Sequence, residues 1–401
     1  MNTAPAKDFK QLLSKVPEVT IYFWIIKVLC TTVGETAADF LNVTLGLGLS
    51  VTSLVVGVLL VFVLFMQFRA HQYIPVIYWL SVFLISIFGT LVTDNLTDNI
   101  GVPLEISTLG FSVVLILLFS LWFKKEKTLS IHSIVTRSRE AFYWLIILFT
   151  FALGTAVGDL MAESLALGYL GTGLIVILVV ACMALAWRLG LNAVLTFWIV
   201  YVSTRPLGAS IGDYLSQPKE YGGLDLGATI TSAVFVAAIA LIVIFLSITK
   251  RDVIESSAVV RSVETNKTPF VQVAVVLSVL VIAGGAGYYW RQDRIDSAAT
   301  QVETSGSVSP SDSLGDLSNF RSITEDTLNL VNADKLPAAK TRVADLEHDW
   351  DSSQSKLKPK NKTKWNEVDG AIDHVLKQLR ASKPDSQKCK TALEDLLVVL
   401  Q

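Results

Sequence analysis

One pattern occurs four times in this chain: a Trp, a Gly ten residues later and an Asp five residues after that. The four copies run from Trp24 to Asp39, Trp79 to Asp94, Trp144 to Asp159 and Trp198 to Asp213. A spacing that is kept four times indicates a duplicated structural unit, and the interval between copies suits two membrane-crossing helices of roughly 20 residues each. We therefore expect four similar two-helix units.

The composition places these units in a membrane. Of the 401 residues, 52% are hydrophobic and only 17% are charged, and the mean hydropathy of +0.54 exceeds that of ordinary soluble domains. The fold class that we predict is an all-α polytopic membrane protein, with four parallel two-helix hairpin repeats, one anchor helix and a small extracytoplasmic helical bundle. Nine apolar runs are long enough to span a bilayer: 20–40, 45–68, 74–94, 103–123, 141–161, 165–187, 191–212, 226–249 and 270–290.

Several functional classes are excluded or disfavoured by the sequence. A net charge of −2 gives no concentrated basic face for nucleic acid, so we expect no nucleic-acid partner. Three cysteines, two of them in apolar runs, do not form a disulfide framework. A phosphate-binding glycine loop, a paired-histidine zinc helix and a Ser-His-Asp order are all missing, so we expect that the protein is not an enzyme, and no cofactor or metal can be named.

The distribution of Lys and Arg predicts the orientation of the spans. These residues collect ahead of the odd-numbered spans, whereas the turns within the four units contain only Lys219. By the positive-inside rule the N-terminus is then cytoplasmic and the segment after the ninth span is extracytoplasmic. Before the first span, Phe9, Leu12, Leu13 and Val16 have the spacing of a short helix in the headgroup region, and a solvated helix end is the alternative.

Changes in composition mark the domain boundaries. Residues 295–316 are rich in Ser, Thr, Asp and Gly, which is typical of a flexible tether, and helical periodicity returns after them with breaks at Asp334, Pro359 and Pro384. We predict a cytoplasmic segment at 1–19, a membrane domain at 20–250, a cytoplasmic linker at 251–269, a ninth span at 270–290, a tether at 291–316 and an extracytoplasmic bundle of about four helices at 317–401.

The repeated carboxylates are the main candidates for a site, because ionisable groups within membrane spans are costly and are usually functional. The repeat Asp lies about 22 Å beyond the repeat Trp on a continuous helix, in the outer half of the membrane. Most have an acidic companion one turn away, and together they would line an outer vestibule that suits protons or divalent cations such as Mg²⁺, Mn²⁺ or Ca²⁺. The candidate residues are Asp39, Asp94, Asp159, Asp213, Glu35, Asp98 and Glu163. The alternative is that each Asp caps the next helix or ties the outer turn.

Two cations and the four tryptophans require separate interpretations. Arg205, before the kinking Pro206, is predicted near mid-membrane as the partner of one carboxylate, which breaks the equivalence of the repeats. We expect Lys27 to reach the cytoplasmic headgroups and the repeat tryptophans to anchor the protein at the membrane interface. The repeat glycines, Gly34, Gly89, Gly154 and Gly208, would permit close helix contacts.

The histidines of the C-terminal segment are weaker candidates. His348 follows Glu347 and precedes Asp349, and His374 follows Asp373, which would allow a metal site between two helices. Solvated helix faces are the commoner explanation of such a pattern.

The repeat resembles a bacterial membrane protein family that is built from four tandem copies of a two-helix repeat with a characteristic Trp and no assigned function. The resemblance rests on the four tryptophans with their Gly and Asp partners and on the opening KVPEVTIYFWIIKVLCTTVGETAADF, and it covers about 20–249. It implies this architecture and a bacterial inner-membrane location, but no activity.

Two functions from different classes follow as expectations. The first is a small-solute or ion transporter coupled to protons or cations at the acidic vestibule. The second is a structural or sensory protein whose membrane ring presents the extracytoplasmic domain to a protein partner.

Overall fold

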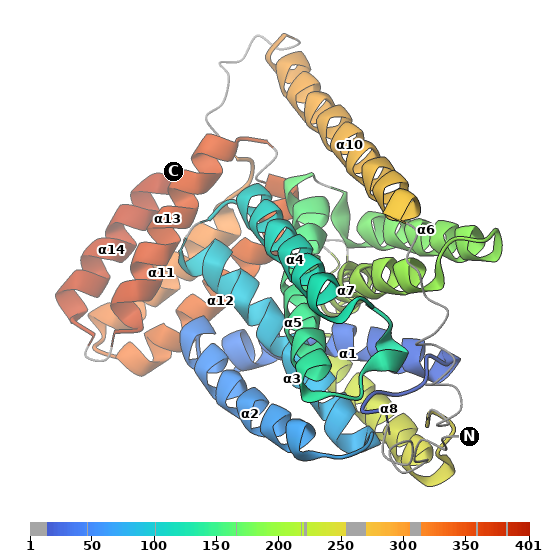
Figure 1. Ribbon diagram of the computed structural model, residues 1–401. Helices are drawn as coiled ribbons and strands as arrows, with labels where there is room; N and C mark the ends of the chain where they lie inside the picture. Colours follow the sequence, from blue (N-terminus) through green and yellow to red (C-terminus); the bar gives the residue numbers. More distant parts are fainter. Residues whose placement is uncertain are drawn as a thin grey trace, which may run out of the picture.

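The computed structural model describes residues 14–45, 47–100, 102–165, 167–217, 219, 223–253, 270–304, 314–357, 360–381 and 384–401. Within these ranges the chain is all-helical and contains no strand (Figure 1). Nine of the helices in this part of the chain are long and apolar enough to cross a membrane, as the sequence predicts. The described residues thus confirm a polytopic all-α fold.

Four helices, the first of each repeat, form a closed inner ring in which each contacts the next and the last contacts the first. These inner helices are α1 (Ile21–Asp39), α3 (Pro75–Asp94), α5 (Arg137–Asp159) and α7 (Ala193–Ser216). We call the end of the ring that holds the repeat tryptophans the Trp end, and the opposite end the Asp end.

The second helix of each repeat lies outside this ring and packs mainly against the inner helix of the following repeat. Thus α2 packs on α3, α4 on α5, α6 on α7 and α8 on α1. The two helices of one repeat therefore belong to different packed pairs. The outer helices are α2 (Leu49–Arg69), α4 (Leu104–Glu126), α6 (Gly168–Arg188) and α8 (Ala228–Thr249).

The repeat glycines set the register between neighbouring inner helices. A methyl group on Gly34 would lie 1.9 Å from Ser86 Oγ, and one on Gly208 would lie 2.0 Å from Thr31 Oγ1. Each glycine faces the residue seven positions after the Trp of the next repeat, and the pattern closes around the ring. The four contacts are Gly34 with Ser86, Gly89 with Phe151, Gly154 with Arg205 and Gly208 with Thr31. This confirms the prediction that these glycines allow close approach.

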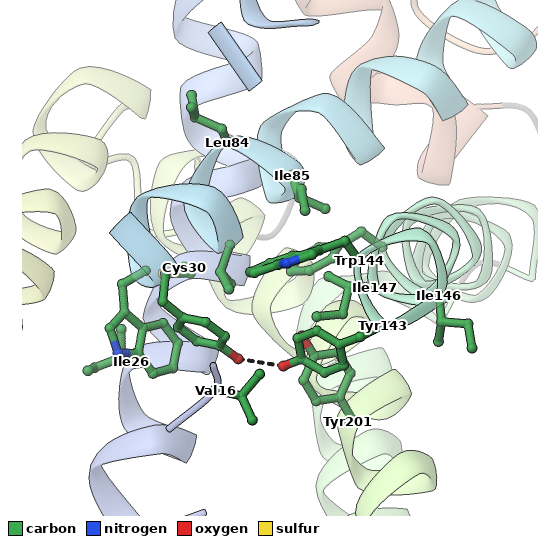
Figure 2. Packing of buried hydrophobic residues seen from close by; sticks show 14 of the residues in the cluster. Val16, Ile26, Cys30, Leu84, Ile85, Tyr143, Trp144, Ile146, Ile147 and Tyr201 are labelled. Atoms are coloured by element: carbon green, nitrogen blue, oxygen red, sulfur yellow. Dashed lines mark hydrogen bonds between the residues drawn. The ribbon is translucent and has the colours of Figure 1, made fainter. Parts of the chain in front are cut away.

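An aromatic layer joins the inner helices at the Trp end. The residue before each Trp packs on the Trp of the next repeat, with ring centroids 5.4–6.3 Å apart around the first three contacts. The pairs are Phe23 with Trp79, Tyr78 with Trp144, Tyr143 with Trp198, and Phe197 with Trp24 at 5.7 Å. Figure 2 shows Tyr143 and Trp144 in this core, with the hydrogen bond between the Tyr78 and Tyr143 hydroxyls (2.5 Å) as a dashed line.

The prediction that the repeat tryptophans anchor the protein at the membrane interface is wrong. Trp79, Trp144 and Trp198 are buried, and Trp24 is half-buried. Their rings pack at tilted or edge-on angles against aromatic rings of the neighbouring repeats. The conserved spacing within the chain thus reflects packing between successive units.

Local signals explain where the inner helices begin. Thr20, Thr136 and Asn192 cap α1, α5 and α7 by accepting hydrogen bonds from backbone N–H groups of the first turn. Pro75 starts α3, where the missing N–H of proline costs nothing. At the Asp end, α1, α3 and α5 continue directly into π-helical turns, whereas α7 remains α-helical to Ser216. These turns are η2 (Phe40–Thr44), η3 (Asn95–Asn99) and η5 (Leu160–Ser164).

The ninth span, α10 (Phe270–Thr304), lies beside the α6–α7 pair. Gln272 accepts a hydrogen bond from the Asn192 N–H, and Arg291 donates to the Leu165 carbonyl at the Asp end. Because α10 is helical to Thr304, the predicted tether at 291–316 is wrong over its first part. Residues 305–313 lie outside the described ranges.

Four helices after the ninth span form a C-terminal helical domain with its own core, as predicted. They are α11 (Ser318–Asn332), α12 (Leu336–Leu357), α13 (Lys362–Leu379) and α14 (Ser386–Val399). Trp350 and Trp365 stack at the centre of this core, 3.9 Å apart. Helix α12 contacts η5, so the domain meets the ring at the Asp end.

Candidate functional site

Arg205 lies at the centre of the inner ring and is 1% exposed. Its guanidinium donates to groups on all three of the other inner helices. Nη2 forms an ion pair with Glu35 Oε2 on α1 (2.5 Å) and also donates to Thr90 Oγ1 on α3. Nε donates to Thr155 Oγ1 on α5 (3.1 Å), and Nη1 donates to the Thr31 carbonyl (2.9 Å). The predicted pairing of Arg205 with a carboxylate is therefore confirmed, and the partner is Glu35.

The repeat symmetry explains how one guanidinium reaches three helices. Glu35, Thr90 and Thr155 each lie eleven residues after their repeat Trp, so they form one layer around the axis. The fourth repeat has Ala209 at this position, which leaves room for the guanidinium that comes from Arg205 one turn earlier. Both threonine hydroxyls donate to backbone carbonyls of their own helices, so their oxygen lone pairs can accept from Arg205.

The buried ion pair of Arg205 and Glu35 has a desolvation cost. A buried ion pair pays several kcal/mol of desolvation per ion, and replacing it with apolar groups of similar volume is often neutral or stabilising. Helix packing alone therefore gives no reason to place Arg205 and Glu35 in the ring. Ionisable groups in membrane spans usually mark a functional path.

Lys27 is a second buried cation in the ring, and it is also 1% exposed. Its ammonium lies 3.6 Å from the centroid of the Phe151 ring and 4.1 Å from that of Tyr201. The expectation that Lys27 reaches the headgroups is wrong, because the side chain points into the core between α5 and α7. Among the residues that the structure describes, no carboxylate forms an ion pair with it.

The four repeat aspartates lie one turn beyond the Arg205 layer and are partly exposed. Asp39, Asp94 and Asp159 are the last residues of α1, α3 and α5, and each is followed directly by a π-helical turn. Asp213 lies within the last turn of α7. All four have interaction partners.

The capping alternative for these aspartates is wrong where it concerns the outer helices. The residues at the N-cap positions of α2, α4, α6 and α8 are Gly48, Pro103, Leu167 and Gly227.

Two carboxylates predicted to line an acidic vestibule lie in the π-helical turns. Asp98 lies in η3 and Glu163 in η5, and their side chains lie outside the described residues. Among the residues that are described, no three His, Cys, Asp or Glu side chains gather as they would around a metal ion. His374 therefore belongs to no such cluster among the described residues. The side chain of His348, the other histidine of the predicted metal site, lies outside the described residues. Of the predicted site residues, the structure brings together Glu35 and Arg205.

A second buried polar cluster closes the Trp end. Lys15 Nζ forms an ion pair with Glu140 Oε2 (2.6 Å) and donates to the Phe68 carbonyl, while Gln67 Nε2 donates to Glu140 Oε1 (3.1 Å). The segment 14–20 that carries Lys15 is not helical and its Val16 is buried in the core, so the predicted headgroup helix does not include Val16; residues 1–13 lie outside the described ranges.

The loops of the Trp end are joined by a further contact. The Tyr73 hydroxyl donates to Asp252 Oδ2 (2.5 Å), just after α8. Burial raises the pKa of the Asp252 carboxyl above its usual value, and burial together with the nearby Asp252 raises the pKa of Tyr73. Backbone hydrogen bonds also join the N-terminal segment 14–20 to three loops of this end, at Tyr73, Ile134 and Asp252.

The sequence prediction missed Lys27 as a core residue and missed the threonines as ligands of Arg205. A signal for both was present. The positions at −1, +3, +7, +11 and +15 from each repeat Trp are four residues apart and therefore share one helix face. Comparing the four repeats at these positions shows that only Lys27, Glu35 and Arg205 are charged on this face before the aspartates.

The fold and the buried pair define the class of protein: a polytopic membrane protein with four tandem two-helix repeats around a polar centre. The repeat described as "Repeat of Unknown Function (DUF347)" matches residues 22–73, 77–128, 142–189 and 196–252. The chain therefore belongs to the DUF347 repeat family. Comparison with curated proteins and with solved structures gave no match.

Proposed function

We propose that this protein is a small-solute or ion transporter coupled to protons or cations, with its path along the axis of the inner ring. The observation that carries the proposal is the buried Arg205, which holds Glu35 and hydrogen-bonds to every other inner helix. An ion pair at this point can act as a switch, because a change in its charge alters the contacts of all four repeats at once.

The mechanism that we propose uses first the layer of the repeat aspartates and then the layer of Arg205 and Glu35. The repeat aspartates at the Asp end concentrate protons or cations at the mouth of the path. Proton transfer to Glu35 abolishes the ion pair and leaves Arg205 held only by neutral acceptors on α1, α3 and α5. The inner helices can then shift relative to one another, which opens the path beyond the Arg205 layer.

The topology that we propose follows the basic loops. The Trp end faces the cytoplasm of a bacterial cell, and the C-terminal helical domain lies outside the inner membrane. The contact of α12 with η5 supports this arrangement, because the Asp end is opposite to the loops rich in Lys and Arg.

The test is proton flux in liposomes that contain the full chain and a trapped pH-sensitive dye. Solutes and the cations Mg²⁺, Mn²⁺ and Ca²⁺ are added in turn, and Glu35→Gln is compared with Glu126→Gln, which removes a carboxylate near the end of α4. We expect solute-dependent proton flux in the wild type and in Glu126→Gln, and its loss in Glu35→Gln. Flux of every solute that is unchanged by Glu35→Gln and by Asp94→Asn with Asp159→Asn would contradict the proposal.

A structural or sensory role is the second candidate, and the contact between α12 and η5 favours it. In that case the ring would position the C-terminal helical domain for an extracytoplasmic protein partner. Deletion of 291–401 would then abolish function in cells, whereas replacing all four repeat aspartates with Asn would not.

A further inference from the structure

Lys27 differs from every other buried Lys, Arg, Asp and Glu side chain that the structure describes. The buried acids and bases in these ranges are Lys15, Lys27, Glu35, Glu140, Arg205 and Asp252. Lys15 pairs with Glu140, Arg205 pairs with Glu35, and Asp252 accepts from Tyr73. Lys27 contacts two aromatic faces instead of a carboxylate. Aromatic faces attract a cation but do not replace a counter-ion in a desolvated site.

Lys27 and Arg205 occupy successive layers on the axis. Lys27 is one turn before Thr31 on α1, and the Thr31 carbonyl accepts from Arg205. On α7, Tyr201 is one turn before Arg205, and the Lys27 ammonium lies over the Tyr201 ring. Both cations thus contact residues of the same two neighbouring helices, α1 and α7. With Glu35 as their only carboxylate among the described contacts, this part of the ring carries one excess positive charge when all three groups are ionised.

The partner that Arg205 already holds indicates the chemistry of a ligand. Its Nη2 donates to one oxygen of the Glu35 carboxylate, and the planar guanidinium is well suited to carboxylates. The buried Phe151 and Tyr201 rings make the surroundings of the Lys27 ammonium apolar, which suits the hydrocarbon group of an organic ligand. A cation is a poor ligand here because it would meet two positive side chains.

We infer that Lys27 and Arg205 bind the carboxylate of a small organic acid, which exchanges with Glu35 as the partner of Arg205. The inference rests on the proposed transporter and names its substrate class. Uncharged Glu35 releases the guanidinium, the substrate carboxylate takes its place, and Lys27 supplies the second positive charge.

The experiment is calorimetric titration of the purified full chain with sodium benzoate and sodium butyrate, with butylammonium chloride as the cationic counterpart. Glu35→Gln removes the competing carboxylate charge, so we expect it to bind the carboxylates at least about tenfold more tightly than the wild type. Adding Lys27→Gln should reverse a gain of about that size, whereas adding Lys27→Arg should keep it. Tighter carboxylate binding by Glu35→Gln cannot result from poor folding, which would weaken binding.

The matched control is the pair Lys15→Met with Glu140→Gln, which removes another buried lysine together with its partner. Carboxylate binding should be the same in this control as in the wild type. Preferential binding of butylammonium, or equal benzoate binding in Glu35→Gln with and without Lys27→Gln, would overturn the inference.

Liposome flux separates this inference from the proposed function. Carboxylate binding with the expected Lys27 dependence but no flux of any solute would support the binding site and count against transport. Flux of cations in a protein that binds no carboxylate would support transport and overturn the substrate class.

Discussion

The inner and outer helices are similar in length but have opposite surroundings. In the inner helices 61–67% of the apolar window is buried in the protein, against 17–22% in the outer helices. The inner helices carry the repeat glycines, Lys27, Glu35 and Arg205. The outer helices expose large apolar side chains such as Leu59, Leu117 and Leu178. The two least apolar of the nine spans found in the described residues, α1 and α7, are those that share the ion pair.

This difference shows where the membrane domain can hold polar chemistry. Side chains that face lipid gain little from being larger or more apolar, because lipid tails are as apolar as Leu. Side chains that face the ring axis contact other protein groups and can satisfy polar partners. The outer helices therefore separate the inner ring from lipid, and the inner ring carries the site.

The largest expected effect comes from removing one member of the buried pair. Arg205→Gln leaves Glu35 buried without its counter-ion, and we expect it to lower the free energy of unfolding by about 3–5 kcal/mol. The control Arg188→Gln changes an exposed arginine at the end of α6 and should have an effect within about 0.5 kcal/mol. Unfolding in detergent, followed by tryptophan fluorescence, measures both. Equal losses in the two variants would contradict the difference between inner and outer helices.

The next effect concerns close helix contact. A Cβ at position 208 would lie 2.8 Å from the backbone carbonyl carbon of Thr31, so Gly208→Ala should destabilise the protein by about 1–3 kcal/mol. Gly110 on α4 has open space around it, and Gly110→Ala should not lower stability. Thermal unfolding of the two variants side by side checks this, and a similar loss in both would break the comparison.

A smaller effect is expected at Asp252, beyond the end of α8. Its pKa is raised in the folded protein, so its contribution to stability is fully present below the unfolded pKa of about 3.9 and is lost as the pH rises through the folded pKa. Asp252→Asn does not ionise, and its stability relative to the wild type should therefore increase from about pH 4 to about pH 8. Unfolding midpoints across this range test the prediction, and a constant difference would refute it.

The smallest effect is expected on the lipid-facing surface. Leu178 on α6 is exposed, and Leu178→Ala should change stability by no more than about 0.5 kcal/mol. Ile146 on α5 is fully buried, and the matched change Ile146→Ala should cost about 2–5 kcal/mol through loss of packing. If the two costs were similar, the outer surface of α6 would have to pack against protein.

Much of the fold could be predicted from the sequence because it depends on local patterns. Apolar length gave the nine spans, and the breaks at Asp334, Pro359 and Pro384 separated the four C-terminal helices. The repeat glycines predict that helices approach closely, but not which residue of the next repeat each glycine contacts. The register of this contact depends on how neighbouring units pack, as when Gly34 faces Ser86.

The site was harder to predict because its members lie on different helices. The position of Arg205 within a span predicted a carboxylate partner, but several carboxylates were available and geometry selects Glu35. Lys27 near the repeat Trp suggested a headgroup contact, because the sequence does not show that the Trp layer is inside the protein. In the structure three of the four tryptophans are buried, and Lys27 next to this aromatic layer is buried as well.

The most direct test of the account is a double-mutant cycle on the pair at the centre of the ring. The free energies of unfolding of Arg205→Gln, Glu35→Gln and the double variant are measured in the full chain. Because the two side chains share an ion pair, the double variant should lose at least about 1 kcal/mol less than the sum of the single losses. Additive losses would contradict the claim that Arg205 and Glu35 join the inner helices.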